Sequence, residues 1–332
     1  MRVKSILITG GAGYIGNHVV KALLEGHATR LIVLDNLTSG FADSLPKNVE
    51  FIQGDILDET LVSNILKTNQ VNTVIHLAAR TIIPESLQNP LKYYQNNTVG
   101  TLNLLTACLK HQVEYFLYSS TAAVYGKQTQ GKIDETATTS PSNPYGHSKL
   151  MSEQIIQDTA FSSKLKYAIL RYFNVAGAAP DLSIGQRTKE ATHLVKVAVQ
   201  TACGLQKSLP LFGTDYPTPD GTCIRDFIHV SDLANAHVKA LHYLQEGGEP
   251  TILNCGYGHG YSVKEIVKAV EKITQATLPT TQAPRREGDI AEVIADNSKI
   301  KTLLQWQPQY DDIDFIVKTA YEWEKTLSKI KS

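Results

Sequence analysis

The sequence predicts an α/β protein: a doubly wound parallel sheet with a second, smaller α/β domain. Two observations favour this fold. Short apolar, β-branched runs alternate with amphipathic stretches through the first half of the chain, and a glycine-rich turn joins the first run to the first amphipathic stretch. After about Asn174 the alternation gives way to Gly-, Ala- and Pro-rich segments. We therefore expect a sheet domain at residues 1–175, with returns near 225–245, and a second domain at residues 176–332.

Apolar periodicity and capping signals predict the individual elements. Buried strands are expected at Val3–Thr9, Leu31–Asp35, Val49–Gln53, Thr73–Leu77, Tyr115–Ser119 and Lys166–Arg171. Helices are expected at Ile15–Glu25, Glu59–Thr68 (with Asp58 as N-cap), Asn96–His111, Pro144–Thr159, Ser231–Leu244, Val263–Thr274 and Ile313–Leu327. Turn residues predict loops at Gly177–Arg187 and Leu209–Thr222.

Composition argues against several classes of protein. The 32 basic and 32 acidic residues cancel, so no global field attracts nucleic acid or an anionic membrane. The apolar runs are too short to cross a bilayer, and the strand-like run at Val3 leaves no room ahead of it for a targeting peptide. The four cysteines lie far apart, without zinc spacing or a dense disulfide framework. We expect no metal site and a reducing compartment, the cytoplasm.

The first strand runs into Gly10-Gly11-Ala12-Gly13-Tyr14-Ile15-Gly16 and then directly into a helix. Three of these glycines permit a tight turn, close approach of the backbone to a pyrophosphate, and close packing of helix on strand. The helix N-terminus offers free amides to phosphate. Asp35 ends the next strand, where a carboxylate suits the ribose diol of NAD and repels the 2′-phosphate of NADP. A Rossmann-type sheet that binds NAD is therefore predicted, against the alternative of a structural turn with a solvated Asp35.

Asp55 follows the third strand, and two interpretations of it stay open. Its carboxylate could meet the adenine of a dinucleotide, or it could cap the following helix.

The segment Asn143-Pro144-Tyr145-Gly146-His147-Ser148-Lys149 carries the candidate catalytic pair. Asn143 suits an N-cap and Pro144 the first helical position, so Tyr145 falls in the opening turn and Lys149 lies one turn on, on the same face. An ammonium and a helix N-terminus both favour the phenolate. We therefore expect Tyr145 to act as general base for an alcohol proton. The alternative is an exposed Tyr/Lys helix face.

Ser119-Ser120-Thr121 closes the fifth strand, at the edge where open α/β sheets bind ligands. The Thr121 hydroxyl could bridge a substrate hydroxyl and Tyr145. Taken alone, it is as readily a hydroxyl that satisfies its own turn. The glycine-rich turn, the strand-end hydroxyl and Tyr-x-x-x-Lys in this order are far more specific together.

These motifs resemble the extended short-chain dehydrogenase/reductase family, that is, the NAD-dependent epimerases and dehydratases. The similarity runs from the first strand to about residue 300. It rests on the Gly10–Gly16 turn, Asp35-Asn36-Leu37, His76-Leu77-Ala78-Ala79, Ser119–Gly126, Tyr145–Lys149, Arg171-Tyr172-Phe173-Asn174, Asp215–Val230 and Pro284–Asp289. Asp215–Val230 is the most specific segment, since related dehydratases and decarboxylases generally lack it.

Within the family, the chain is most similar to members that invert the 4-hydroxyl of a UDP-hexose, interconverting UDP-galactose and UDP-glucose. The resemblance implies a cycle without net redox change, in which Tyr145 takes the 4-hydroxyl proton while tightly held NAD takes and later returns a hydride. The implied NAD contacts are Gly10, Gly13, Tyr14, Ile15, Gly16, Asp35, Asn36, Asp55, Ile56, Leu77, Ala78, Ala79, Asn96, Ser119, Tyr145, Lys149 and Tyr172.

The same resemblance implies a second set of residues at the UDP-sugar, held by the smaller domain. They are Thr121, Tyr145, Asn174, Phe212, Arg225, Arg286, Asp289 and Val293, with Arg225 and Arg286 at the diphosphate and Phe212 at the uracil. Family analogy also implies a homodimer formed through Asn96–His111 and Pro144–Thr159.

Three positions depart from the family pattern. Thr81, beside Arg80, stands where some members have a lysine that contacts the cofactor, and His193 stands where an asparagine can contact the substrate. The roles of these residues stay open. Val293 stands where a bulky tyrosine can crowd the sugar's 2-position, so we hypothesise that this chain also has room for an N-acetyl group.

Two other functions stay open on the sequence alone. A neighbouring dehydratase or decarboxylase would carry an acidic residue just after Thr121, where this chain has Ala122 and Ala123. A non-catalytic NAD-sensing protein would have no need of the Tyr145 and Lys149 pair.

Overall fold

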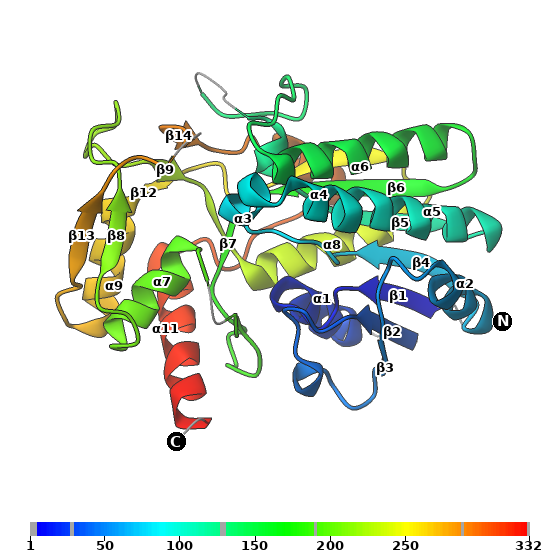
Figure 1. Ribbon diagram of the computed structural model, residues 1–332, viewed down its shortest axis with the longest axis horizontal. Helices are drawn as coiled ribbons and strands as arrows, with labels where there is room; N and C mark the ends of the chain where they lie inside the picture. Colours follow the sequence, from blue (N-terminus) through cyan, green and yellow to red (C-terminus); the bar gives the residue numbers. More distant parts are fainter. Residues whose placement is uncertain (1–4, 27–29, 127–130, 189–190, 287–288, 331–332) are drawn as a thin grey trace.

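A seven-stranded parallel sheet forms the centre of the larger part of the molecule (Figure 1). The computed structural model describes residues 5–26, 30–126, 131–188, 191–286 and 289–330. The strand order is β11-β6-β5-β4-β1-β2-β3. The strands are β1 (Ser5–Thr9), β2 (Arg30–Asp35), β3 (Glu50–Gln53), β4 (Val71–His76), β5 (Tyr115–Thr121), β6 (Lys166–Tyr172) and β11 (Thr251–Cys255).

Helices cover both faces of this sheet, which is why the middle residues of its central strands are mostly apolar and buried. Successive side chains point to opposite faces: Ile8 packs in one core with α1 and α8, and Leu7 packs in the other with α2, α5 and α6. These helices are α1 (Tyr14–Glu25), α2 (Glu59–Thr68), α5 (Gly100–Lys110), α6 (Pro144–Phe161) and α8 (Val230–Gln245). Shorter turns of helix between them are η1 (Ala42–Ser44), α3 (Ile83–Gln88), α4 (Pro90–Tyr93), η2 (Tyr94–Val99) and η3 (Ala122–Val124).

The second part of the chain uses short strands in three small sheets (Figure 1). These pair as β10-β7, β12-β9-β14 and β13-β8. The strands are β7 (Asn174–Ala176), β8 (Leu209–Phe212), β9 (Ile224–Arg225), β10 (Phe227–His229), β12 (Tyr261–Ser262), β13 (Thr280–Ala283) and β14 (Glu292–Val293). The helices are α7 (Leu194–Ala202), α9 (Val263–Thr274), α10 (Ser298–Leu304) and α11 (Ile313–Ile330).

The predicted fold class is confirmed, and so are most elements. Helices α2 and α9 have the predicted bounds, and Asp58 caps α2 by accepting the Leu61 amide at 2.9 Å. The first strand starts at Ser5, and Val3 and Lys4 lie outside the described residues. The division into two domains at residue 175 stays a prediction. The chain does return to the sheet at α8 and β11.

The helix expected at Asn96–His111 is confirmed, since η2 and α5 are helical through Lys110, but its first residues form a π-helical turn. The segment Leu209–Thr222, in which turn signals were noted, begins with strand β8, which Pro210 disguised because proline occurs in strands mainly at sheet edges. Strand β11 went unpredicted, since its run is short and contains Asn254. Within the described residues, no helix combines the length and apolarity that a membrane span requires.

Candidate active site

The glycine-rich turn has a geometry that only glycine allows. Gly10 has a φ of 72°, in the left-handed region. A Cβ atom on Gly16 would lie 2.2 Å from the Gly10 carbonyl oxygen, and one on Gly10 would lie 2.6 Å from the Ala78 nitrogen. Gly13 precedes α1, and no side chain caps that helix. The backbone here fits a diphosphate at the helix N-terminus, as the NAD prediction requires.

Asp35 lies at the end of β2, directly beside this turn. Its carboxylate accepts the amide of Ala12 at 3.1 Å and that of Leu37 at 2.8 Å. Burial raises the pKa of Asp35, while these two hydrogen bonds oppose the rise. The alternative of a solvated strand-end carboxylate is wrong, because Asp35 is only 7% exposed.

Asp55 is joined to the neighbouring loop and does not cap α2. It accepts the Asn36 side-chain amide at 2.9 Å and the Leu57 backbone amide at 2.9 Å. The capping interpretation is therefore wrong, since Asp58 fills that role. Ile56 is buried, and a Cβ atom on Gly100 would lie 2.5 Å from it.

The segment after β4 is held against helix α6 by Asn97, a residue that the sequence did not indicate. Asn97 accepts the Arg80 backbone amide at 2.8 Å and donates to the Ser148 hydroxyl at 3.0 Å. The neighbouring Asn96 donates to Asn97 at 3.0 Å. The signal available in the sequence was the pair of consecutive asparagines, Asn96 and Asn97, within a predicted helix. Thr81, next to Arg80, is exposed.

Tyr145 and Lys149 lie where the sequence places them, at the start of α6. Asn143 caps that helix by accepting the Gly146 amide at 2.9 Å. Tyr145 is 8% exposed and Lys149 is 3% exposed, so the alternative of an exposed helix face is wrong. The Lys149 ammonium lies 4.3 Å from the centre of the Tyr118 ring, and the Tyr145 ring meets that of Tyr93 edge-on.

The charge states of this pair differ from expectation. Burial raises the pKa of Tyr145, and the hydrogen bond with Thr121 opposes the rise. Burial lowers the pKa of Lys149 to about 7. The protein alone therefore does not hold Tyr145 as a phenolate, because the loss of solvation outweighs the hydrogen bond with Thr121.

The local-turn role weighed for Thr121 is observed, and its bridging role toward a substrate hydroxyl stays a prediction. Its hydroxyl accepts the Ala123 amide at 3.1 Å, which satisfies the local turn, and it also bonds to Tyr145. Two residues earlier on the same strand, Ser119 bonds hydroxyl to hydroxyl with Tyr172 of the adjacent strand β6. Burial raises the pKa of Tyr172, so its phenol stays protonated.

Four of the residues predicted for the UDP-sugar form two pairs in the second part, each joining a side chain on a short strand to one in the loop between β13 and β14. The Arg225 guanidinium lies 3.3 Å from the Asp289 carboxylate, and that of Arg286 lies 3.9 Å from the centre of the Phe212 ring. By contrast, Arg285 binds Asp215 at 2.8 Å. Glu287 and Gly288 of this motif lie outside the described residues.

Val293 and Asn174 connect these pairs to the large sheet. Val293 is opposite Arg225 in the β14–β9 ladder and packs against a small core that contains Val124 and Tyr125, just after Thr121. The Asn174 amide donates to the Asp226 carbonyl at 3.0 Å.

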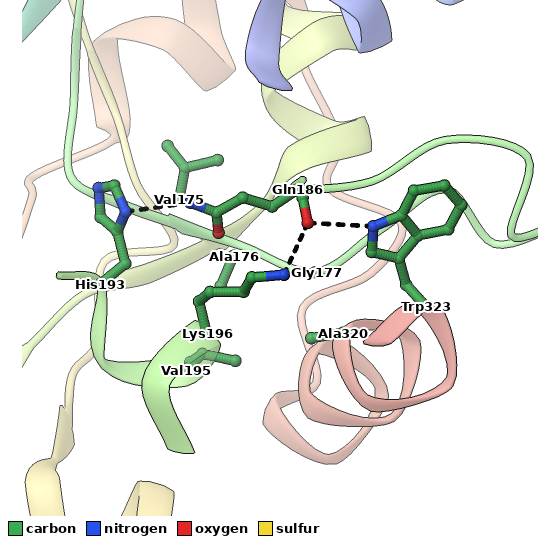
Figure 2. A pocket seen from close by; sticks show the side chains of 9 residues that line it. All are labelled: Val175, Ala176, Gly177, Gln186, His193, Val195, Lys196, Ala320 and Trp323. Carbon is green, nitrogen blue, oxygen red and sulfur yellow. Dashed lines mark hydrogen bonds between the residues drawn. The ribbon is translucent and has the colours of Figure 1, made fainter. Parts of the chain in front are cut away.

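A separate pocket of about 280 Å³, partly open to solvent, lies next to Gly177 (Figure 2). His193 points to the Gln186 side chain, 3.3 Å away, while the Gln186 carbonyl accepts from Lys196 at 2.7 Å and Trp323 at 3.1 Å (Figure 2). The role of His193 stays open.

A Rossmann-type sheet with a dinucleotide turn and a buried Tyr-Lys pair at the carboxyl ends of its strands defines an NAD-type dehydrogenase/reductase site. Residues 6–256 match the NAD dependent epimerase/dehydratase family, and the chain belongs to that family.

Relatives match over nearly the whole chain. A UDP-glucose 4-epimerase of Azospirillum brasilense is 47% identical over 98% of this chain and 93% of its own length. The structure of the UDP-Glc/GlcNAc 4-epimerase of Campylobacter jejuni is 45% identical with a TM-score of 0.84, covering 97% of this chain and 99% of its own. That of a UDP-glucose 4-epimerase of Bifidobacterium longum with NAD+ and UDP is 36% identical with a TM-score of 0.92, covering 97% and 98%.

Proposed function

We propose that this chain is a UDP-glucose 4-epimerase that interconverts UDP-galactose and UDP-glucose through a transient 4-keto sugar. The observation that carries the proposal is the placement of Thr121, Tyr145 and Lys149. They are buried together at the carboxyl ends of the parallel strands, the edge where the glycine-rich turn also lies. The relatives named above support the proposal, because proteins named UDP-glucose 4-epimerase match this chain over nearly its full length.

In this proposal the chain's own residues hold the cofactor and move one proton. The turn at Gly10–Gly16 takes the diphosphate, Asp35 takes the adenosine ribose, and Lys149 takes the nicotinamide ribose. Bound NAD supplies reversible oxidation and reduction at the sugar carbon, together with a positive charge near Tyr145 that lowers its pKa. The Tyr145 oxygen would receive the 4-hydroxyl proton through or beside Thr121 and would return it to the 4-keto oxygen after the sugar has turned its other face to the cofactor.

The second part of the chain holds the UDP group. Arg225 and Arg286 offer planar, multi-donor guanidinium groups to the diphosphate, and Phe212 offers a ring to the uracil. Asp289 and Asn174 complete this set. In the free protein Arg225 already lies beside Asp289, and Arg286 lies beside Phe212. The side chains proposed to bind the UDP group are therefore already close to one another before it binds.

The test is incubation of the purified protein with UDP-galactose without added cofactor, followed by product analysis. We expect UDP-glucose to form. Tyr145→Phe should lower kcat by about 10²- to 10⁴-fold, the usual value of general acid–base catalysis, while NAD stays bound. Unchanged turnover in this variant would refute the assignment of the base, and a 4,6-dehydrated product would instead favour a dehydratase.

We also propose that N-acetylated UDP-hexoses are substrates. Val293 supports this, because its small side chain lies beside Arg225 and the Val124–Tyr125 core, close to where the sugar ring would sit. The Campylobacter jejuni relative is named for both sugars. Val293→Tyr should abolish turnover of UDP-N-acetylglucosamine and keep that of UDP-glucose. Equal loss on both sugars would count against a role at the 2-position.

A homodimer in the cytoplasm completes the proposal. The support is a set of exposed apolar side chains on α5 and α6: Leu102, Leu109, Met151 and Phe161. The described cysteines are all free, as in a reducing compartment. Sedimentation of the purified protein should give twice the chain mass, and Leu102→Glu with Met151→Glu should give monomers.

A further inference from the structure

Helix α6 carries a third buried titratable group besides the predicted pair. Tyr145, Lys149 and Glu153 follow one another at intervals of four residues, so their side chains share one face of α6. The Glu153 side chain is 0% exposed, and that of its partner Arg171 is 5% exposed. A buried carboxylate on the face that carries the reacting groups is costly unless it is well bonded.

Glu153 is bonded to both strands that bear other site residues. Arg171 on β6 holds it with two nitrogens, at 3.0 Å and 2.6 Å, and the Ser120 hydroxyl on β5 donates to it as well. Ser120 directly precedes Thr121, and Arg171 directly precedes Tyr172. The carboxylate thus joins helix α6 to the ends of β5 and β6. Its partners there are each one residue away from a hydroxyl group of the site, that of Thr121 or that of Tyr172.

Arg171 extends this network to the edge of the sheet. It donates to the Tyr125 hydroxyl at 3.1 Å, and that hydroxyl donates to Asn254 on β11 at 2.6 Å. Each side chain of this hydrogen-bonded network, which runs from Glu153 through Arg171 and Tyr125 to Asn254, has a hydrogen-bond partner. Such a network fixes positions, because no member can move without leaving another unsatisfied.

Glu153 also lies one helical turn from Lys149, on the same buried face of α6. The titratable groups around Lys149 are Tyr118 on β5, His76 on β4, and Tyr145 and Glu153 on its own helix. Burial keeps Tyr118 and Tyr145 protonated and His76 neutral. Among these described groups, Glu153 alone brings a negative charge, and it opposes the lowering of the Lys149 pKa by burial.

We propose that Glu153 is a positioning residue for the proposed epimerase reaction: it locks helix α6 to the ends of β5 and β6, and its carboxylate stabilises the protonated form of the buried Lys149. The part that concerns turnover rests on the proposed function, whereas the part that concerns Lys149 does not. Without the carboxylate, the Lys149 ammonium is lost at lower pH. The alkaline limb of kcat then moves to lower pH, since the ammonium form is the one that serves Tyr145.

The experiment compares wild type, Glu153→Gln, and Glu153→Gln combined with Arg171→Met. The double variant removes the buried guanidinium that the single one leaves unpaired, so it keeps the test open if the single variant does not fold. In protein with ¹³C-labelled lysine, the Lys149 resonance, identified by its loss in Lys149→Arg, reports that pKa directly. We expect the Lys149 pKa to fall by about one unit or more in Glu153→Gln, because a nearby opposite charge is removed, and to fall by less in the double variant, which also loses a cation.

The matched control is Glu324→Gln combined with Lys196→Met, which neutralises an equally buried ion pair in the second part of the chain. It should leave the Lys149 resonance unchanged. An unshifted Lys149 pKa in the Glu153 variants, or an equal shift in the control, would overturn the proposal. A shifted Lys149 pKa in a protein without epimerase activity would sink the proposed function and leave this role of Glu153 standing.

Discussion

The two halves of the proposed site are built in opposite ways. In the sheet half, the key side chains are buried and joined to backbone or strand ends, as Asp35 is to Ala12 and Leu37. In the second half, the key side chains stand on short strands, as Phe212 and Arg225 do, or in the loop between β13 and β14, as Arg286 and Asp289 do, and they pair with one another near the surface. The ion pair of Arg225 and Asp289, for example, has side chains that are 18% and 30% exposed.

This difference follows from what each half must do. Proton transfer and cofactor binding need fixed distances, which a parallel sheet and buried hydrogen bonds provide. Binding and turning a sugar nucleotide need groups that can exchange partners, and surface ion pairs are weak enough to break. Changes in the sheet half should therefore be severe or should alter chemistry, whereas changes in the second half should mainly alter substrate affinity.

The largest effect is expected at the turn. Gly16→Ala would place a Cβ atom 2.2 Å from the Gly10 carbonyl oxygen, a clash with backbone that cannot be relieved by a rotamer. We expect at least a hundredfold loss of NAD affinity, about 2.7 kcal/mol, measured by calorimetry on the cofactor-free protein. Gly26→Ala, at the other end of α1, meets nothing closer than 3.5 Å and should bind NAD normally. Equal losses in both would show that the helix as a whole, and not the turn, is sensitive.

A smaller effect is expected from the cost of burying the catalytic lysine. The pKa of Lys149 falls from 10.5 to about 7 on folding, so between these pH values the unfolded chain holds a proton that the folded chain has released. Stability therefore rises with pH across that window, and below about pH 7 the full cost of the buried charge remains.

Lys149→Met keeps most of the side-chain volume and removes this cost. We expect a gain of roughly 2 kcal/mol in the free energy of unfolding at pH 7, since the lost contact with the Tyr118 ring offsets part of the larger electrostatic gain. The gain should shrink as pH rises toward 10.5. Urea unfolding at several pH values measures it, and a less stable Met variant at pH 7 would contradict the idea that the sheet half gives up stability for chemistry.

The sequence predicted the sheet half better than the second half, for a physical reason. Fully buried strands and capped helices leave strong local signals, as Asp58 and Asn143 show at the starts of α2 and α6. The short strands β9 and β14 have two residues each and depend on partners far away in the chain, so periodicity cannot reveal them. Resemblance to a family, and not local pattern, pointed to Arg225 and Asp289.

Charge states and internal networks could not be predicted either. The sequence shows that Tyr145 and Lys149 share a helix face but not that both are buried, and burial decides the direction of both pKa shifts. The bond between Glu153 and Arg171 likewise joins residues 18 positions apart whose meeting depends on the packing of α6 on β6.

The smallest effect separates two adjacent arginines of the second half. Arg286 lies over Phe212, free to meet a phosphate, whereas Arg285 is held by the Asp215 side chain and backbone and lies over Tyr216. Loss of a charge-assisted hydrogen bond costs about 1.5 kcal/mol, so Arg286→Ala should raise KM for UDP-galactose about tenfold with little change in kcat. Arg285→Ala removes an exposed ion pair, which is worth little, and should change KM by no more than about twofold. If kcat falls instead of KM rising, the second half shares in the chemistry, and the contrast between the two halves is weaker than their burial suggests.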